Sequence, residues 1–283
     1  MTSLVKPLVL SSFHDRDKGR MTGIPPFAVE MIEKHFRIVW IEDFNANPEK
    51  YGKEVVAVFM GTKQPTVDKD LLEKLPNLKI VASMSAGYNH LDIPLIRSYG
   101  VRVSNTPYVL DNATADLGMA LLLNAGRELY SNINFAMSPG TTHFDMNLMS
   151  GDVSGTTLGI VGMGRIGCKV AERARAFNMN ILYHNRSKRN DDSAIGATYY
   201  SKLNDMLPHC DHIIITLPLT AETNKIIGAQ QFKLMKSTSI LINIARGALW
   251  TTTHSYTRSH TAKSNSPLST SPTQSRYHVT TRC

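Results

Sequence analysis

The stretch TTLGIVGMGRIGCKVAERARAF, residues 156–177, decides the fold class of this chain. Its first residues are mostly β-branched or apolar, which predicts a buried strand that ends at Val161. GMGRIG, residues 162–167, then follows the pattern G-x-G-x-x-G, and a helical pattern begins directly after it. This order predicts a dinucleotide-binding turn, because glycines permit a tight turn, close approach of a pyrophosphate and close packing of helix against strand. A glycine-rich turn without a ligand, or for a different nucleotide, is the alternative.

The helix start offers free N–H groups and a partial positive charge to the cofactor phosphates. The residues that we expect to contact the cofactor here are Gly162, Gly164, Arg165, Ile166 and Gly167. The next predicted strand, NILYH at 180–184, ends in the loop NRSKR at 185–189. An acidic residue about 20 positions after the glycines would bind the ribose 2′-hydroxyl of NAD. No carboxylate appears from the start of this strand to Asp191.

Basic and hydroxyl side chains stand where that carboxylate would be. Arg186 and Ser187 can bind a 2′-phosphate, since a guanidinium and a hydroxyl both donate hydrogen bonds to phosphate oxygens. We therefore predict NADP(H) as the preferred cofactor and NAD(H) as the second option, with Asn185 also in contact. A solvent-exposed basic loop without a cofactor role is the alternative.

Outward from this turn, short apolar runs alternate with helical patterns along the whole chain. The expected strands are 7–12, 36–40, 55–59, 78–83, 101–105, 156–161, 180–184, 212–216 and 239–244. Helices are expected at 25–35 and 68–75, and one starts near Asp111 or Asn112, both good N-caps. Apolar residues on consecutive strand positions are typical of parallel strands buried on both faces. The sequence thus predicts an α/β protein with two doubly wound parallel-sheet domains.

The charge distribution argues against several classes of function. The net charge is +8, but eight of the 31 Lys and Arg residues follow Glu222, the last acidic residue. The first 222 residues hold 23 basic and 23 acidic side chains, so no basic patch for nucleic acid is expected. No run approaches the roughly 20 apolar residues of a membrane helix, and no secretory signal is evident. Three cysteines without metal spacing predict no metal site and a cytoplasmic protein.

Four further motifs occur in a familiar order and spacing. They are SMSAGYNHLD (83–92), SNTPYVLDNATADLGMALLL (104–123), TLPLTAETNKII (216–227) and KSTSILINIARGAL (236–249). Together with the glycine turn, they make the chain resemble the D-isomer-specific 2-hydroxyacid dehydrogenase family, most of all its glyoxylate/hydroxypyruvate reductases. The resemblance implies a flavodoxin-like substrate domain at 1–105 and a Rossmann cofactor domain at 106–250 that is incomplete.

The resemblance also implies roles for single residues. Backbone N–H groups of Ala86 and Gly87 would bind the substrate carboxylate, with Tyr88 in the same loop. Arg246 would hold a small 2-oxo acid, and a structural Arg at a strand end is the alternative. The remaining implied cofactor contacts are Thr114, Thr216, Pro218, Thr223, Ile244 and Ala245. In the family, hydride passes from the nicotinamide to the carbonyl carbon, and a His held protonated by a Glu supplies the proton.

The family pattern stops after Leu249. Of the 33 residues that follow Trp250, 16 are Ser or Thr and none is acidic, and apolar residues are sparse. We interpret 251–283 as a disordered tail unrelated to the family, from an altered reading frame or splice end; a regulatory tail is the alternative. Without the Glu and His we expect almost no activity, since losing a positioned general acid costs about 10²–10⁴-fold. We also expect an exposed apolar edge at the strand 239–244.

A different class of function stays open. The chain could be a catalytically silent nucleotide-binding protein or a dimer partner. Family members homodimerise through their cofactor domains, and the helix 113–128 and arm 131–153 resemble that contact. Binding of NADPH without turnover would favour this second class.

Overall fold

The computed structural model describes residues 5–12, 26–61, 65–141, 149–251 and 278–280. The chain divides into two compact units, residues 1–109 and 110–283, and each is described by itself. The predicted boundary between residues 105 and 106 lies four residues before the observed division. None of the helices in the described part of the chain is both long and apolar enough to cross a membrane.

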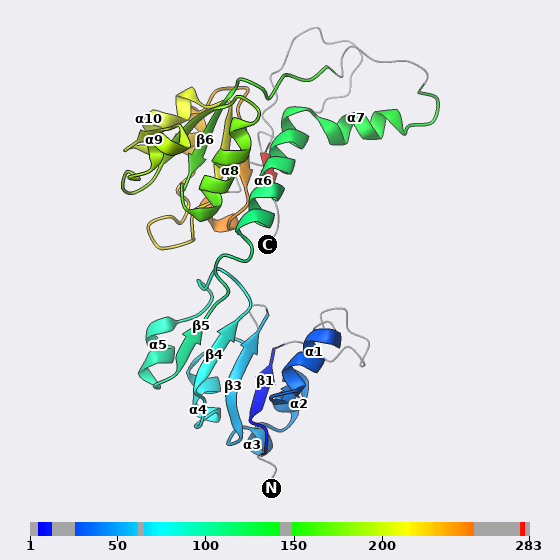
Figure 1. Cartoon of the computed structure of the whole chain (residues 1–283), viewed down its shortest axis with the longest axis vertical. Helices are drawn as coiled ribbons and strands as arrows, with labels where there is room; N and C mark the ends of the chain where they lie inside the picture. The colour runs from blue at the N-terminus through cyan, green and yellow to red at the C-terminus, as the bar shows by residue number, and fades with distance from the viewer. Residues whose placement is uncertain (1–4, 13–25, 62–64, 142–148, 252–277, 281–283) are drawn as a thin grey trace. The chain divides into compact units, whose positions relative to one another are not determined.

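The first unit is a parallel sheet with the strand order β2-β1-β3-β4-β5, and Figure 1 labels β1, β3, β4 and β5 in this order. Its strands are β1 (Leu8–Ser11), β2 (Arg37–Trp40), β3 (Val55–Met60), β4 (Ile80–Ser83) and β5 (Arg102–Ser104). Its helices are α1 (Pro26–Glu33), α2 (Ile41–Ala46), α3 (Pro48–Tyr51), α4 (Lys69–Lys74) and α5 (Ile93–Ser98). Strands and helices alternate because parallel neighbours require crossover connections.

Side-chain caps fix where two of these helices begin. The carboxylate of Asp68 accepts a hydrogen bond from the backbone N–H of Leu71 at 3.0 Å, which starts α4. Asp92 caps α5 in the same way through the N–H of Leu95, also at 3.0 Å. Such caps satisfy N–H groups that have no partner inside the helix.

The second unit is also a parallel sheet, with the order β11-β10-β9-β6-β7-β8. Its strands are β6 (Thr157–Val161), β7 (Asn180–His184), β8 (Ala197–Tyr200), β9 (His212–Ile215), β10 (Ile240–Asn243) and β11 (His278–Thr280). Its helices are α6 (Asp111–Gly126), α7 (Leu129–Ala136), α8 (Arg165–Arg175), α9 (Asp192–Ile195), α10 (Leu203–Met206), η3 (Leu207–His209), α11 (Ala229–Leu234) and η4 (Gly247–Leu249).

Alternate residues of the central strands enter cores on opposite faces of this sheet. Ile160 of β6 and Ile214 of β9 pack in one core with side chains from α6 and α8. Their neighbours Val161 and Ile215 pack in a second core with side chains from α10 and α11. Every residue of β9 and β10 is buried. The predicted α/β class with doubly wound parallel sheets is therefore confirmed.

The structure differs from two expectations about helix starts and strands. α6 begins at Asp111, but its N-cap is Leu110 and no side chain caps it. The Asp111 carboxylate instead pairs with Arg165 at 2.9 Å. β8 was not predicted from the sequence, because none of its four residues is buried and it directly follows Gly196, which has a left-handed backbone conformation.

The tail also differs from the prediction at three residues. β11 pairs in parallel with β10, in the register Leu241↔His278, Ile242↔Val279 and Asn243↔Thr280. The expectation of an uncovered β10 edge is wrong at these positions, because a strand edge with unpaired N–H and C=O groups accepts a further strand. The predictions for 252–277 and 281–283 concern residues outside the described part of the chain.

Candidate functional site

Three glycines shape the turn between β6 and α8, and each meets a different constraint. Gly162 has a φ of 109°, and a Cβ on it would lie 2.9 Å from the Leu217 side chain. A Cβ on Gly167 would collide with the carbonyl oxygen of Gly162, so α8 packs tightly against the end of β6. A Cβ on Gly164 would meet nothing within 4 Å. The backbone at Gly164 is thus open to a ligand, as close approach of a pyrophosphate requires.

The start of α8 lies directly beside this open backbone. Gly164 is its N-cap and brings no capping side chain. The first N–H groups of a helix lack partners within the helix and carry its positive dipole end, which suits a phosphate. Arg165 and the partly buried Ile166 belong to this first turn. The turn therefore fits the phosphates of a dinucleotide in both backbone shape and charge.

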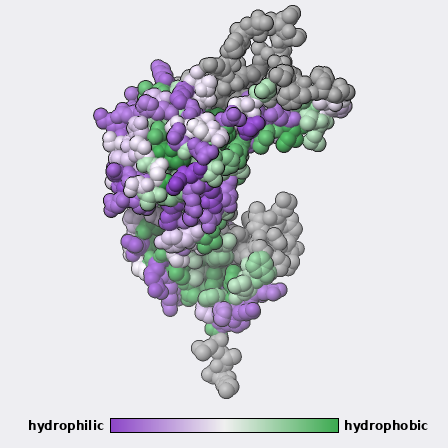
Figure 2. Space-filling model, turned by 45° about the horizontal axis from the view of Figure 1, so that its top comes forward, coloured by the Kyte–Doolittle hydropathy of each residue, from purple (hydrophilic) through white to green (hydrophobic). Residues whose placement is uncertain are grey.

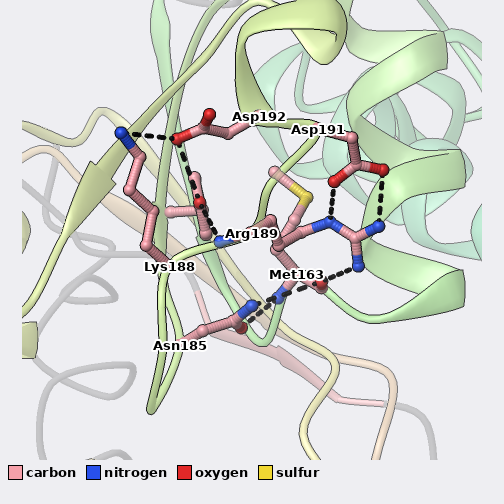
Figure 3. Close-up of polar contacts among 7 residues, drawn as sticks. Met163, Asn185, Lys188, Arg189, Asp191 and Asp192 are labelled. Atoms are coloured by element: carbon pink, nitrogen blue, oxygen red, sulfur yellow. Dashed lines mark hydrogen bonds and ion pairs between the residues drawn. The ribbon is translucent and has the colours of Figure 1, made fainter.

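Asn185, the residue after β7, holds the middle of the glycine turn (Figure 3). Its Oδ1 accepts a hydrogen bond from the N–H of Met163 at 2.7 Å, and its Nδ2 donates to the Met163 carbonyl at 3.3 Å. The pairing of Val161 with His184 brings these two loops together. Asn185 thus has a partner in the protein, and the predicted contact with a cofactor stays a prediction.

Two of the cations in the loop after β7, Lys188 and Arg189, lie beside carboxylates. Arg189 forms two hydrogen bonds of 2.7 Å to the Asp191 carboxylate. These bonds lower the pKa of Asp191, and they also raise the pKa of Arg189. Lys188 lies 3.5 Å from Asp192. Arg186 and Ser187 are exposed, which leaves them accessible to a ligand.

The loop after β9 faces the glycine turn from the next strand of the sheet. The Thr216 N–H donates to the carbonyl of Val161 at 3.0 Å, and its hydroxyl donates to the carbonyl of Gly162. Thr223 donates its hydroxyl to the Pro218 carbonyl at 2.7 Å and folds the loop back on itself. The carboxyl ends of parallel neighbours β6 and β9 thus meet at one edge, where open α/β sheets bind ligands.

The turn after β10 is shaped by Asn243, a residue that the sequence analysis did not single out. Asn243 is 3% exposed. Its Oδ1 accepts from the Ala245 N–H at 2.9 Å, and its Nδ2 donates to the Arg246 carbonyl at 2.8 Å. Arg246 is half-buried, and its Nη1 donates to the Ala245 carbonyl at 3.0 Å. The Asn in ILIN, at the end of a fully apolar strand, was the available signal.

Two predicted cofactor residues, Thr114 and Ile244, lie on the face of the second unit's sheet that α6 covers. Ile244 is buried in the core that α6 covers. A Cβ on Gly118 of α6 would lie 2.8 Å from the Ile214 side chain and 3.0 Å from that of Ile244. This close packing holds α6, and with it the partly buried Thr114, against the ends of β9 and β10.

The predicted substrate loop belongs to the first unit and follows β4. Asn105 donates to the Ala86 carbonyl at 2.8 Å, and the Ser85 hydroxyl donates to the Gly87 carbonyl at 2.5 Å. Both carbonyl groups are thus engaged within the loop. Within the described ranges, the N–H groups of Ala86 and Gly87 have no acceptor, and Tyr88 is 56% exposed. The loop can therefore offer two N–H donors to an anion.

A groove of about 780 Å³ runs along the outer face of α8. Its lining shares only Arg165 with the predicted cofactor residues. Cys168 lies in it, and burial raises the pKa of that thiol. Three cations of the groove lie beside anions, such as Lys169 at 3.0 Å from Glu172, and Arg175 donates to the Ile195 carbonyl at 3.3 Å. We therefore place the candidate site at the glycine turn. The described residues contain no cluster of His, Cys, Asp or Glu suited to a metal ion.

Comparison with known proteins identifies the family. Residues 119–256 match the NAD-binding domain of the D-isomer-specific 2-hydroxyacid dehydrogenases. A glyoxylate reductase of Pyrococcus horikoshii is 38% identical over 233 residues, which are 79% of this chain and 70% of that protein. The chain belongs to the D-isomer-specific 2-hydroxyacid dehydrogenase family. The predicted family is thus confirmed, and with it a nicotinamide dinucleotide as cofactor and small 2-oxo or 2-hydroxy acids as the substrate class.

Two solved structures of this family show the same fold with different cofactors. An NADPH-dependent glyoxylate/hydroxypyruvate reductase from Sinorhizobium meliloti, solved with NADP and malonate, is 26% identical, with a TM-score of 0.79. The aligned region covers 97% of this chain and 86% of the reductase chain. A D-lactate dehydrogenase from Aquifex aeolicus, solved with NAD and lactic acid, is 26% identical with a TM-score of 0.76. The aligned region covers 90% of this chain and 73% of the dehydrogenase chain.

Proposed function

We propose that this 2-hydroxyacid dehydrogenase takes glyoxylate or hydroxypyruvate as its 2-oxo acid and that its 283 residues catalyse the reduction only slowly. The observation that carries the proposal is the glycine turn, in which Gly162 and Gly167 are sterically required and Gly164 leaves its backbone open. A nicotinamide bound there supplies the hydride. The relatives that are named glyoxylate reductases support the choice of substrate.

Each unit, taken by itself, offers donors for a 2-oxo acid. In the first, the N–H groups of Ala86 and Gly87 offer two donors to a carboxylate. In the second, Arg246 offers two parallel donors to carboxylate and carbonyl oxygens, because its guanidinium is planar. Asn243 keeps the backbone of Arg246 in place, since both of its hydrogen bonds bridge the turn after β10.

The slow reduction follows from the missing proton donor. The carbonyl oxygen gains negative charge during the reaction and must receive a proton. No Asp or Glu occurs after Glu222, so no carboxylate side chain of that part of the chain can hold a His protonated. We assign Arg246 to binding of the 2-oxo acid and not to proton donation. We expect turnover about 10²–10⁴-fold below that of a relative with a positioned acid.

The test is an assay of the purified 283-residue chain with NADPH or NADH and either acid, beside the Pyrococcus horikoshii reductase. Binding of a dinucleotide with strongly reduced turnover is expected. Imidazole in the buffer should raise the rate of this chain, because it substitutes for the missing acid, and should leave an Arg246→Gln variant inactive. Equal turnover of both enzymes would overturn the loss of activity, and failure to bind either dinucleotide would overturn the function.

We also propose a preference for NADPH over NADH. Arg186 and Ser187 are exposed donors of the loop after β7, whereas the nearest following carboxylate, Asp191, is engaged with Arg189. We expect an Arg186→Gln variant to lose affinity for NADPH about tenfold, because one charge-assisted contact is lost, and to keep its affinity for NADH. An equal loss for both cofactors in this variant would contradict the preference.

A second candidate function is pairing with another subunit without catalysis. The observation that favours it is α7, of which no residue is buried. Tyr130 is 72% exposed and Ile133 54% exposed, and Figure 2 shows hydrophobic surface, in green, on the arm that carries this helix. Exposed apolar side chains grouped on one helix are typical of an interaction surface. A monomer in analytical ultracentrifugation, alone and with a relative's full-length subunits, would argue against this function.

A further inference from the structure

The strongest unexplained feature of the second unit is the way in which Arg189 is held. It belongs to the loop after β7, yet its Nη1 donates a hydrogen bond of 3.0 Å to the carbonyl of Met163, in the middle of the glycine turn. Its other donors meet both oxygens of Asp191. Figure 3 shows the guanidinium between the carboxylate and the turn. The side chain thus bridges two loops that are 26 residues apart in sequence.

We propose that the Arg189–Asp191 ion pair holds the backbone of the glycine turn in its phosphate-binding shape, and that Arg189 is therefore a positioning residue for the dinucleotide. The inference rests on the proposed function, because it assigns a role within the same cofactor site. It differs from a direct contact with a 2′-phosphate, which would be the simpler role for an Arg in this loop.

The geometry at Met163 supports positioning. The Met163 residue is 1% exposed, and both of its backbone polar groups are bound by the loop after β7. Asn185 binds the N–H at 2.7 Å, and Asn185 and Arg189 share the carbonyl at 3.3 and 3.0 Å. With the Met163 peptide held from both sides, the adjoining backbone of Gly164 is kept in place, although a Cβ on Gly164 would meet nothing within 4 Å.

The loop is braced so that Arg189 keeps this position. The backbone N–H of Arg189 donates to the Tyr183 hydroxyl at 3.0 Å. Tyr183 is fully buried, and its hydroxyl also lies 3.3 Å from the carboxylate of Asp192. Asp191 then fixes the guanidinium through two parallel bonds, which define its plane as well as its distance. A fixed guanidinium loses little conformational entropy when the cofactor binds.

The two roles of Arg189 predict different patterns of cofactor affinity. A positioning residue affects binding of the pyrophosphate, which NADH and NADPH share, so its loss lowers the affinity for both cofactors equally. A ligand of the 2′-phosphate acts on NADPH alone. We expect Arg189→Met to lower the affinity for both cofactors about fivefold to tenfold. This is the usual effect of losing one hydrogen bond from a charged donor at a partly exposed site. The ratio of the two dissociation constants should stay unchanged.

The experiment measures dissociation constants for NADH and NADPH with the full 283-residue chain and three variants. Arg189→Met removes the bridge, and Asp191→Asn removes the charge that fixes it. Lys188→Met is the matched control, because it removes a neighbouring cation whose partner is Asp192 and not the turn. We expect losses with an unchanged ratio for the first two variants. The control should match the wild type for NADH.

Hydrogen exchange at the turn provides a readout that does not depend on the cofactor. The Met163 amide should exchange faster in Arg189→Met than in Lys188→Met, with unchanged exchange in β9 as evidence that the variant is folded. A loss confined to NADPH, or a gain of NADPH affinity in Asp191→Asn, would overturn the proposal in favour of direct phosphate binding. Unchanged exchange at Met163 would also overturn it. If the wild type binds neither cofactor, the proposed function fails, and the exchange result still decides the bridge.

Discussion

Gly164 and Gly167 lie three residues apart in one turn, but the structure constrains them in different ways. A Cβ on Gly167 has no room, whereas a Cβ on Gly164 meets nothing within 4 Å. We expect Gly167→Ala to destabilise the second unit by about 1–3 kcal/mol, as overpacking does, and to weaken dinucleotide binding as a consequence. We expect Gly164→Ala to keep its melting temperature and lose affinity, because its methyl group occupies the approach of the pyrophosphate.

Thermal unfolding together with titration of NADPH separates these two effects. Gly164→Ala is the control for Gly167→Ala, since both variants add one methyl group to the same turn. The assignment of the phosphate site to this turn would be refuted by a Gly164→Ala protein that binds NADPH as tightly as the wild type.

His212, the first residue of β9, gives the second unit a dependence on pH. It is 5% exposed, and its Nδ1 lies 3.3 Å from the Thr156 hydroxyl. Burial lowers the pKa of His212 from 6.5, although the adjacent Asp211 acts in the opposite direction. The unfolded chain takes up a proton below about pH 6.5, whereas the folded chain takes it up only at a lower pH. The free energy of unfolding therefore falls as the pH drops below that value.

Urea unfolding measured from about pH 7 down to about pH 5 tests this dependence. The wild type should lose stability across this interval, and a His212→Gln variant should lose less, because its side chain does not titrate. Identical slopes for the two proteins would show that the imidazole is not responsible.

At the scale of elements, the predictability of a strand follows from what it packs against. β9, with the sequence HIII, is buried at every position, so its apolar run identified it directly. β8 and β11 are edge strands that each pair on one side only, and neither has an apolar run that marks it.

In the candidate site, Gly162 and Gly167 are visible in the sequence as a motif. The contacts of Asn185 and Arg189 with Met163, in contrast, depend on the register of β6 and β7. Such contacts cannot be predicted from local sequence.

β11 itself leads to a prediction about the edge of the sheet. It pairs along Leu241, Ile242 and Asn243 of β10, and so satisfies backbone groups that would otherwise be open to other chains. We expect a chain that ends at residue 275 to show faster amide exchange in β10 and stronger aggregation on heating. Exchange in β3 of the first unit serves as the internal reference. Equal exchange in β10 with and without the last eight residues would mean that this pairing adds no stability.

At the scale of the whole molecule, the two units have separate cores. Leu10, Val58 and Val81 belong to a cluster within the first unit, whereas Ile160 and Ile214 belong to one within the second. All the predicted cofactor residues lie in the second unit, between Thr114 and Ala245, and Ala86 and Gly87 lie in the first. We therefore expect a dinucleotide to stabilise the second unit selectively, since a ligand stabilises only the fold that binds it.

The magnitude of this stabilisation follows from the dissociation constant. At a free NADPH concentration of about 100 times that constant, the second unit should gain about 2.7 kcal/mol. Amide exchange resolved along the chain should slow in β6, β9 and β10 and stay unchanged in β1 and β3. A Gly164→Ala chain under the same conditions controls for effects of NADPH that do not involve the site. Equal protection of both units would contradict selective stabilisation, and would mean that they unfold as one cooperative body.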